Sequence, residues 1–243
     1  MNNRIRLCIF DLGGTIVDKY SLSPFISLKQ AFKNKRINVN NHLIYKDMGM
    51  NKHEHIQEIL KDKYIRRIWF KLYGQYPNKN SAMSVYDEFI RYQMDEGIKN
   101  IDILPETKKT IQWLGDNNIS TGVTTGFPRP IMNAIKEKLL DEDIYIDKYV
   151  SSTCLGKGKP GRPNPHMMNE IINKLDLTFD TRKIIKVDDT CVGIQEGKNA
   201  GTLTIGVAKW STNMKMTEYN HDENMSKEEY VERLKSSREE LWK

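Results

Sequence analysis

The sequence predicts an α/β fold: a mostly parallel sheet covered by helices on both faces, with a helical insertion after the first strand. Three observations support this prediction. Residues 4–10 form an apolar run with a β-branched residue, followed by Gly13 and Gly14, which is typical of a buried strand that ends in a turn. Residues 23–100 are rich in aromatic residues, Lys and Met at helical spacing. From residue 103 onward, strand and helix patterns alternate.

The alternating part begins with a helix that opens at Pro105. The next predicted elements are a strand over 120–124, a helix over 130–140, a strand over 149–152, a helix over 165–175, a strand over 183–187, a helix over 194–199 and a strand over 202–207. Residues 212–225 are polar and are interpreted as a linker. Ser226 and Glu229 have the spacing of a capping box, which predicts a last helix to about Trp242.

Composition excludes several classes of protein. The chain has 243 residues, of which 38% are hydrophobic, which suits one core domain with an insertion or two small domains. Its apolar runs are far shorter than the ~20 residues that span a bilayer, and its first residues do not resemble an export signal. Three cysteines without a CxxC pair favour a cytoplasmic location. The net charge is +6, but the basic residues are spread along the chain and do not form a cluster. Neither a nucleic-acid nor a membrane partner is therefore expected.

Four short segments place reactive side chains where parallel strands end or helices begin. They are Asp11 to Thr15, Thr124 to Gly126, Lys159 to Pro165, and Val187 to Thr190. Glycines after Asp11 let backbone N–H groups close around an anion, and the threonines of the second segment offer hydroxyls to a phosphoryl oxygen. Arg162 can neutralise a phosphate, and the adjacent Asp188 and Asp189 suit Mg²⁺. Each segment alone is common in solvated turns, but all four are expected to converge at one edge of the sheet.

The order of these segments resembles the haloacid dehalogenase superfamily, in which an aspartate nucleophile, a Thr, a Lys or Arg and acidic Mg²⁺ ligands follow one another on a Rossmann-like core. The resemblance assigns the nucleophile to Asp11, phosphate binding to Gly14, Thr15, Thr125, Gly126 and Arg162, and the metal to Asp11, Gly13, Asp188 and Asp189. It also implies that residues 19–101 are an α-helical cap domain inserted into a core of residues 1–18 and 102–243. Such a cap closes over a small substrate and excludes water.

Gly13 departs from the phosphatase pattern of that superfamily. Phosphatases carry a second Asp at this position, which protonates the leaving alkoxide. Residues 47–56 account for the difference, because their Met-Gly-x-x-Lys-x-x-His run resembles the signature of the phosphonatases, the phosphonoacetaldehyde hydrolases. In that family the lysine forms an imine with the substrate aldehyde. Electrons from the breaking C–P bond then enter the imine, so no alkoxide needs a proton.

This second resemblance implies roles for Lys52, Asp11 and His55. Lys52 would form the imine and must be partly neutral, Asp11 would attack phosphorus, and His55 on the same helical face would assist proton transfer. The implied reaction is Mg²⁺-dependent hydrolysis of phosphonoacetaldehyde to acetaldehyde and phosphate, by a homodimer associated through its caps. A solvated surface lysine is the alternative for Lys52. For the protein, the alternatives are a hydrolase of another small phosphorylated metabolite and a catalytically silent phosphate-binding protein.

Some positions depart from the phosphonatase pattern. Gly193 stands where a further metal-binding Asp is expected, while Asp188 adds a carboxylate where glycine is frequent. Phe127 replaces an aromatic hydroxyl, and Ser21 replaces a cysteine. Relatives usually add a further strand segment after the position of Lys243, so a sheet edge is expected to be exposed or covered by a partner.

Overall fold

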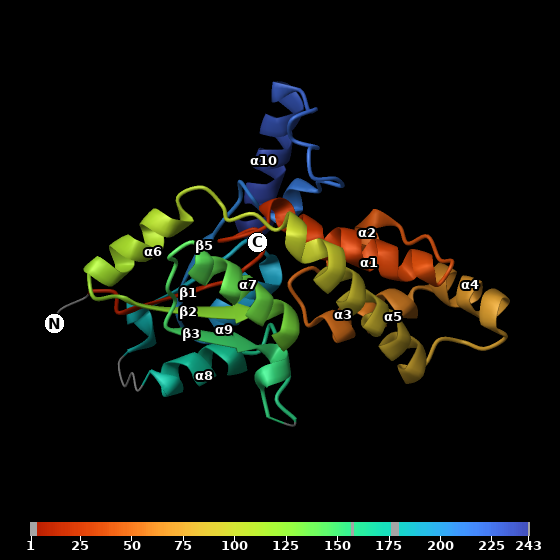
Figure 1. Ribbon diagram of the computed structural model, residues 1–243, viewed down its shortest axis with the longest axis horizontal. Coiled ribbons are helices and arrows are strands. Elements are labelled where there is room, and N and C mark those ends of the chain that lie inside the picture. The colour runs from red at the N-terminus through yellow and green to blue at the C-terminus, as the bar shows by residue number, and fades with distance from the viewer. Residues whose placement is uncertain (1–3, 157, 176–179, 243) are drawn as a thin grey trace.

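A parallel five-stranded sheet forms the centre of the molecule (Figure 1). The computed structural model describes residues 4–156, 158–175 and 180–242, so the parts of the predicted core on residues 1–3, 157, 176–179 and 243 lie outside the described residues. The strands are β1 (Leu7–Phe10), β2 (Ser120–Thr125), β3 (Lys148–Ser151), β4 (Ile184–Asp188) and β5 (Leu203–Gly206), in the spatial order β3-β2-β1-β4-β5. Every pair is parallel, which confirms the predicted α/β fold and brings the carboxyl ends of the strands to one edge.

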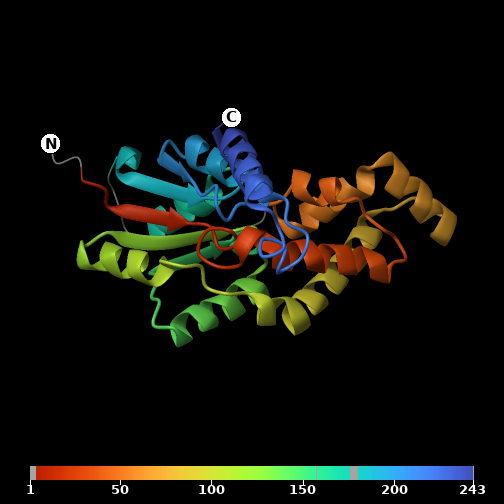
Figure 2. The same ribbon diagram turned by 90° about the horizontal axis from the view of Figure 1, so that it is seen from above.

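Helices cover both faces of the sheet (Figure 2). One face carries α6 (Thr107–Asp116) and α7 (Arg129–Asp141), and the other carries α8 (His166–Lys174) and α9 (Cys191–Asn199). Alternation along β1 explains the two layers: Leu7 and Ile9 pack in the cluster that contains Met167 and Ile171 of α8, whereas Phe10 packs in the larger cluster with α6 and α7. Burial on both faces gives β1 its continuous apolar sequence.

The helical segment after β1 lies beyond the carboxyl edge of the sheet (Figures 1 and 2). It contains α1 (Leu22–Asn34), α2 (Asn41–Lys46), α3 (Lys52–Lys61), α4 (Lys63–Tyr73) and α5 (Lys79–Tyr92). Polar side chains fix where these helices begin: Asn51 accepts hydrogen bonds from the backbone N–H groups of His53 and Glu54, and Asp62 caps α4 in the same way. Lys52 is therefore held at the first position of α3.

The chain enters this segment through a junction in an unusual backbone conformation. Asp18, Tyr20 and Ser21 have φ of 57°, 62° and 48°, which is the left-handed region that non-glycine residues rarely adopt. Asp18 accepts from the backbone N–H of Ser23 at 3.2 Å, and burial raises the pKa of Asp18 to about 7. The surrounding contacts hold this junction in place although its backbone conformation is costly.

Residues 212–225 differ from the predicted linker. Met214 and Met216 are fully buried, and Tyr45 of α2 donates a hydrogen bond to the Met216 carbonyl, so the segment packs between the core and the inserted helices. The polar composition concealed these two methionines.

In the last helix, α10 (Lys227–Trp242), Ser226 accepts from the Glu229 N–H at 3.1 Å as predicted, but the Glu229 carboxylate pairs with Arg233 instead of completing the capping box.

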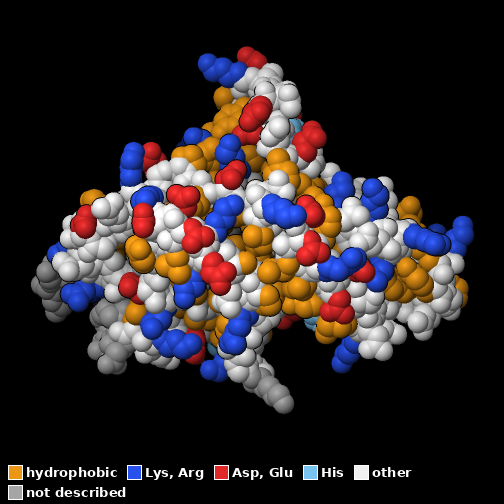
Figure 3. Space-filling model, viewed as in Figure 1, with side chains coloured by type: hydrophobic (Ala, Val, Ile, Leu, Met, Phe, Trp, Pro, Cys, Tyr) orange, Lys and Arg blue, Asp and Glu red, His pale blue; other side chains and the backbone are white. Residues whose placement is uncertain are grey.

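The surface shows mixed charge. On the face in Figure 3, Lys and Arg side chains are interspersed with Asp and Glu rather than gathered in one patch. At the edge of the sheet, Leu203 and Ile205 of β5 are about half exposed. Among the described helices, none combines the length and the apolar character that crossing a membrane requires.

Candidate active site

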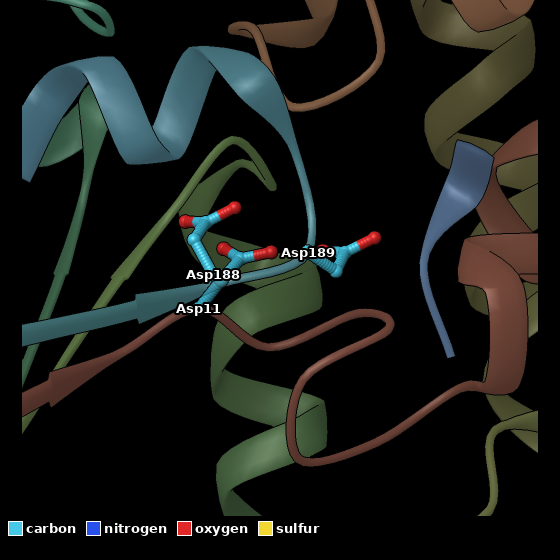
Figure 4. Close-up of side chains that lie close together, drawn as sticks. All are labelled: Asp11, Asp188 and Asp189. Atoms are coloured by element: carbon cyan, nitrogen blue, oxygen red, sulfur yellow. The ribbon is translucent and has the colours of Figure 1, made fainter. Parts of the chain in front are cut away.

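Three buried aspartates meet at the carboxyl edge of the sheet (Figure 4). Asp11 follows β1, Asp188 ends β4, and Asp189 comes next in the chain. One oxygen from each carboxylate lies within 4.8 Å of the others. The register of β1 against β4 explains why these carboxylates lie close together, because Phe10 pairs with Val187 and the Asp11 N–H donates to the Val187 carbonyl at 2.9 Å. Figure 4 shows the Asp11 carboxylate between the other two.

Gly14 lets the loop after β1 pass close to Asp189. Its φ is +66°, and a Cβ there would lie 2.4 Å from Asp189 Oδ2, so a side chain is excluded. The N–H of Gly14 donates to the carbonyls of Val17 and Asp18, and the N–H of Thr15 donates to a carbonyl within the same turn. The backbone N–H groups of Gly14 and Thr15, which the sequence assigned to phosphate binding, therefore form hydrogen bonds within the turn. Gly13 is the glycine that lines the cavity beside Asp11.

Arg162 lies fully buried beside the nucleophile candidate. Its Nη2 is 2.9 Å from Asp11 Oδ1 and 3.2 Å from Asp188 Oδ2, and its Nε donates to Glu196 Oε2 at 2.9 Å. Its Nη1 has no hydrogen-bond partner among the described residues. A buried guanidinium nitrogen without an acceptor suits an anionic oxygen, as the sequence predicted for phosphate.

Gly193, where the phosphonatase pattern has a further Asp, lies against the side chain of Asp188. A Cβ at Gly193 would lie 1.9 Å from Asp188 Oδ2, so the Asp188 side chain fills the space that a larger residue at 193 would need. Its Oδ1 accepts from the N–H and the hydroxyl of Thr190 at 3.0 and 2.7 Å, and its Oδ2 lies 2.9 Å from Lys186 Nζ. Asp188 therefore has protein partners at both oxygens, although it belongs to the acidic cluster.

The acidic cluster fits a divalent cation. Asp189 Oδ2 accepts from the Thr212 N–H at 3.0 Å, while its buried Oδ1 has no partner in the described part of the chain. Burial raises the pKa of Asp189 well above its usual range, and the nearby charges of Asp188 and Asp11 raise it further. Around Asp11, the four buried carboxyl groups of Asp11, Asp188, Asp189 and Glu196 outnumber the three buried basic side chains of Arg162, Lys186 and Lys52. Hard oxygen ligands with this excess suit Mg²⁺, and Asp11 and Asp189 are the residues placed to hold it.

Lys52 of α3 is buried above this edge, not solvated. Its side chain is 4% exposed, and its Nζ lies 3.5 Å from the Met50 carbonyl, 3.8 Å from Met48 Sδ and 5.9 Å from the centre of the Phe127 ring. Burial lowers the pKa of Lys52 from 10.5 to about 8; Asp11 opposes this shift, while the positive Arg162 adds to it. A substantial fraction of Lys52 is thus neutral near pH 8, as a nucleophilic amine requires.

His55 lies one turn further along α3 and is fully buried. Burial lowers the pKa of His55 to about 3, and the neighbouring positive charge of Lys52 contributes to this shift. The imidazole is therefore neutral over the physiological range. His55 is not among the residues that line the cavity, so any role it has in proton transfer acts through Lys52.

A small cavity joins the two halves of the site. Asp11, Gly13, Lys52 and Thr125 contribute to its walls, and further lining residues are Ser21, Pro24, Met48, Gly49, Gly126, Phe127 and Thr190. Its free volume is about 20 Å³, little more than one water molecule needs. Among these residues Asp11 supplies the carboxylate. A Cβ at Gly13 would lie 2.7 Å from Ser21 Oγ, so Ser21 takes the space of the acid that phosphatases place there.

A glycine allows the two walls to touch. A Cβ at Gly126, after β2, would lie 2.5 Å from the Met50 carbonyl and 2.7 Å from that of Gly49, in the loop that precedes α3.

We expect Gly126→Ala to push this loop and Lys52 away from Asp11, lowering kcat/KM about 10- to 100-fold. Steady-state kinetics beside melting temperatures checks this. Gly115→Ala in α6, where the added methyl meets nothing, is the control, and equal activity of both variants would contradict the prediction.

Comparisons with known proteins agree with this geometry. A family model described as haloacid dehalogenase-like hydrolase matches residues 5–201. The chain belongs to this family. It is 30% identical over 237 residues to the phosphonoacetaldehyde hydrolase of Paraburkholderia phytofirmans, covering 98% of this chain and 87% of that protein. It is 29% identical over 208 residues to the enzyme of the same name from Latilactobacillus sakei, covering 86% of this chain and 77% of that protein.

A solved structure supports the same assignment within the haloacid dehalogenase-like hydrolases. The phosphonoacetaldehyde hydrolase-like protein from Oleispira antarctica superposes with a TM-score of 0.90 at 26% identity, covering 98% of this chain and 84% of that chain. The predicted resemblance to phosphonatases and the prediction of a hydrolase are confirmed.

Two buried residues beside Arg162, Lys186 and Glu196, were not assigned roles from the sequence. They contact each other and the Thr124 hydroxyl, which the sequence analysis offered to a phosphoryl oxygen. A lysine at the centre of an otherwise apolar strand was a signal for Lys186, because an unpaired charge is rarely buried. Nothing in the sequence pairs Lys186 with Glu196, since they lie on different elements.

Proposed function

We propose that this hydrolase cleaves the C–P bond of phosphonoacetaldehyde to give acetaldehyde and phosphate, with Mg²⁺ as cofactor. The observation that carries the proposal is that Lys52, buried and with a lowered pKa, lines the same cavity as Asp11 where the acid of phosphatases is replaced by Gly13. We also propose that residues 19–101 act as the cap that delivers Lys52. The names of the relatives support this substrate.

In the first half of the reaction, Lys52 forms an imine with the substrate. Its neutral amine attacks the aldehyde carbon, and loss of water together with uptake of one proton from solvent gives an imine that is protonated on nitrogen. An Asp11 oxygen then attacks phosphorus while the C–P bond breaks. The bonding electrons move into the protonated imine and produce an enamine, so the leaving carbon needs no proton at that moment.

The second half regenerates both residues. The enamine takes up a proton at carbon, and water hydrolyses the resulting imine to acetaldehyde and free Lys52. Water also hydrolyses the Asp11 phosphoryl ester to phosphate. The Arg162 guanidinium, which contacts Asp11, is positioned to offset the negative charge of the phosphoryl oxygens, and Mg²⁺ held by Asp11 and Asp189 would add to this.

Trapping the imine tests this function directly. Incubation with phosphonoacetaldehyde and sodium borohydride is expected to reduce the imine to a stable secondary amine on Lys52, inactivating the protein and adding the mass of the reduced adduct. Peptide mapping locates the adduct, and omission of borohydride is the control. Phosphate release without any Lys52 adduct would contradict the proposal and favour a phosphatase.

The pH dependence gives a second test. Because the pKa of Lys52 is lowered to about 8, the reactive neutral amine gains about tenfold per pH unit below that value and then levels off. We expect kcat/KM and the rate of borohydride trapping to share this rising limb near pH 8. A limb near 10.5, the ordinary value for lysine, would show that Lys52 is not the group that reacts.

We propose that two copies associate through their caps. Figure 3 shows hydrophobic side chains at the end of the molecule formed by α4. Exposed large side chains of this region are Tyr64, Phe70, Leu72, Tyr73 and Tyr76. Light scattering on the wild type is expected to give a dimer that Phe70→Glu weakens. A wild-type monomer at all concentrations would contradict this.

A further inference from the structure

Behind Asp11, buried side chains form a continuous charged network. Its members are Thr124, Arg162, Lys186, Asp188 and Glu196, each at most 2% exposed. The Thr124 hydroxyl lies at the centre: it accepts from Arg162 Nη2 at 2.9 Å and Lys186 Nζ at 2.8 Å, and it donates to Glu196 Oε2 at 2.8 Å. A hydroxyl offers one proton and two lone pairs, so this one is fully used.

The network fixes the orientation of Arg162. Glu196 holds its Nε at 2.9 Å, while the Thr124 carbonyl holds its Nη2 at 2.7 Å. Because a guanidinium group is planar, fixing Nε and Nη2 also fixes the direction of Nη1. Nη1 remains as the donor without a partner among the described residues, in a group that contacts Asp11.

Lys186 balances the acids that share this space. Its Nζ lies 2.9 Å from Asp188 Oδ2 and 3.6 Å from Glu196 Oε2. Without it, Arg162 alone would neutralise Asp11, Asp188 and Glu196. A buried ion network costs more desolvation free energy than a well-packed apolar core, so stability alone does not account for it.

We propose that Glu196, Lys186 and Thr124 are positioning residues that hold the Arg162 guanidinium against Asp11, so that it meets the phosphoryl group bound there. The inference rests on the proposed function only in that a phosphoryl group binds beside Asp11. It extends that function by assigning the orientation of Arg162 to residues that touch neither substrate nor metal.

Binding of inorganic phosphate in the presence of Mg²⁺, measured by calorimetry, tests the proposal without requiring turnover. Glu196→Gln keeps the shape of the side chain and removes its charge. It is expected to weaken phosphate binding about tenfold and to lower kcat by a similar factor. In an Arg162→Lys background, which keeps the charge but loses the planar fork, Glu196→Gln is expected to change phosphate binding less than about twofold.

Thr124→Val is the second variant, because replacing a hydroxyl by a methyl group changes volume little and keeps the test open if Glu196→Gln fails to fold. It is expected to show the same dependence on Arg162. Glu170→Gln on α8, a partly exposed carboxylate away from the network, is the control and is expected to bind phosphate like the wild type.

Three outcomes would overturn the proposal: equal effects of Glu196→Gln in both backgrounds, a lowered melting temperature with unchanged phosphate affinity in both single variants, or no phosphate binding by the wild type. Turnover is assayed separately. If phosphate binding depends on Glu196 through Arg162 while the wild type leaves phosphonoacetaldehyde intact, the positioning role stands and the proposed function fails.

Discussion

Asp11→Asn is expected to reduce phosphate release from phosphonoacetaldehyde by roughly 10⁴-fold or more. Asparagine has the size of aspartate but no nucleophilic oxygen, and it weakens the acidic cluster with Asp189. Burial raises the pKa of Asp11, so the carboxylate is costly to keep charged in the folded protein and its removal is not expected to unfold the chain. Release of phosphate and acetaldehyde is measured in parallel.

The same variant separates the two halves of the reaction. Because imine formation needs Lys52 and not the Asp11 nucleophile, borohydride is still expected to trap the substrate on Lys52 in Asp11→Asn. Asp143→Asn, an exposed aspartate after α7, is the matched control with wild-type activity. Phosphate release within about tenfold of the wild type would exclude Asp11 as the nucleophile.

Lys52→Arg is expected to lower C–P cleavage by roughly 10³-fold or more, because arginine keeps the positive charge but does not form an imine with an aldehyde. Without the imine, the carbon leaving phosphorus has no group to accept its electrons. The measurements are acetaldehyde release and the borohydride adduct, and both are expected to disappear.

The control for this variant lies on the same helix. Lys61→Arg changes an exposed lysine at the other end of α3 and is expected to leave activity unchanged. If Lys52→Arg kept phosphate release while losing the borohydride adduct, the imine would be a side reaction. The hydrolase would then cleave its substrate by another route.

The sheet could be predicted because an apolar run marks its first strand and strand patterns alternate with helix patterns from residue 103 onward. The predicted ranges overlap all five observed strands. The positions of Asp11, Asp188 and Asp189 followed from this, since parallel strands end at one edge. The burial of Lys52 could not be predicted, because it depends on how α3 packs over a loop more than seventy residues away in the chain.

The partners of Asp188 could not be predicted either. From the sequence, two adjacent acids are equivalent candidate ligands, yet Asp188 pairs with Lys186 and Thr190, whereas one Asp189 oxygen has no hydrogen-bond partner among the described residues. The relation between Asp188 and Gly193 depends on side-chain volume in three dimensions. A sequence shows that an acid is missing at 193 but not that another occupies its space.

The contact between Gly126 and the loop before α3 has a consequence for the timing of catalysis. A cavity of about 20 Å³ does not admit a substrate while these backbones touch, so every turnover includes one opening for entry and one for escape. In the proposed reaction, the enamine would be shielded from the bulk solvent between these events and committed to product. The frequency of opening then sets an upper limit on turnover, independent of how fast the C–P bond breaks.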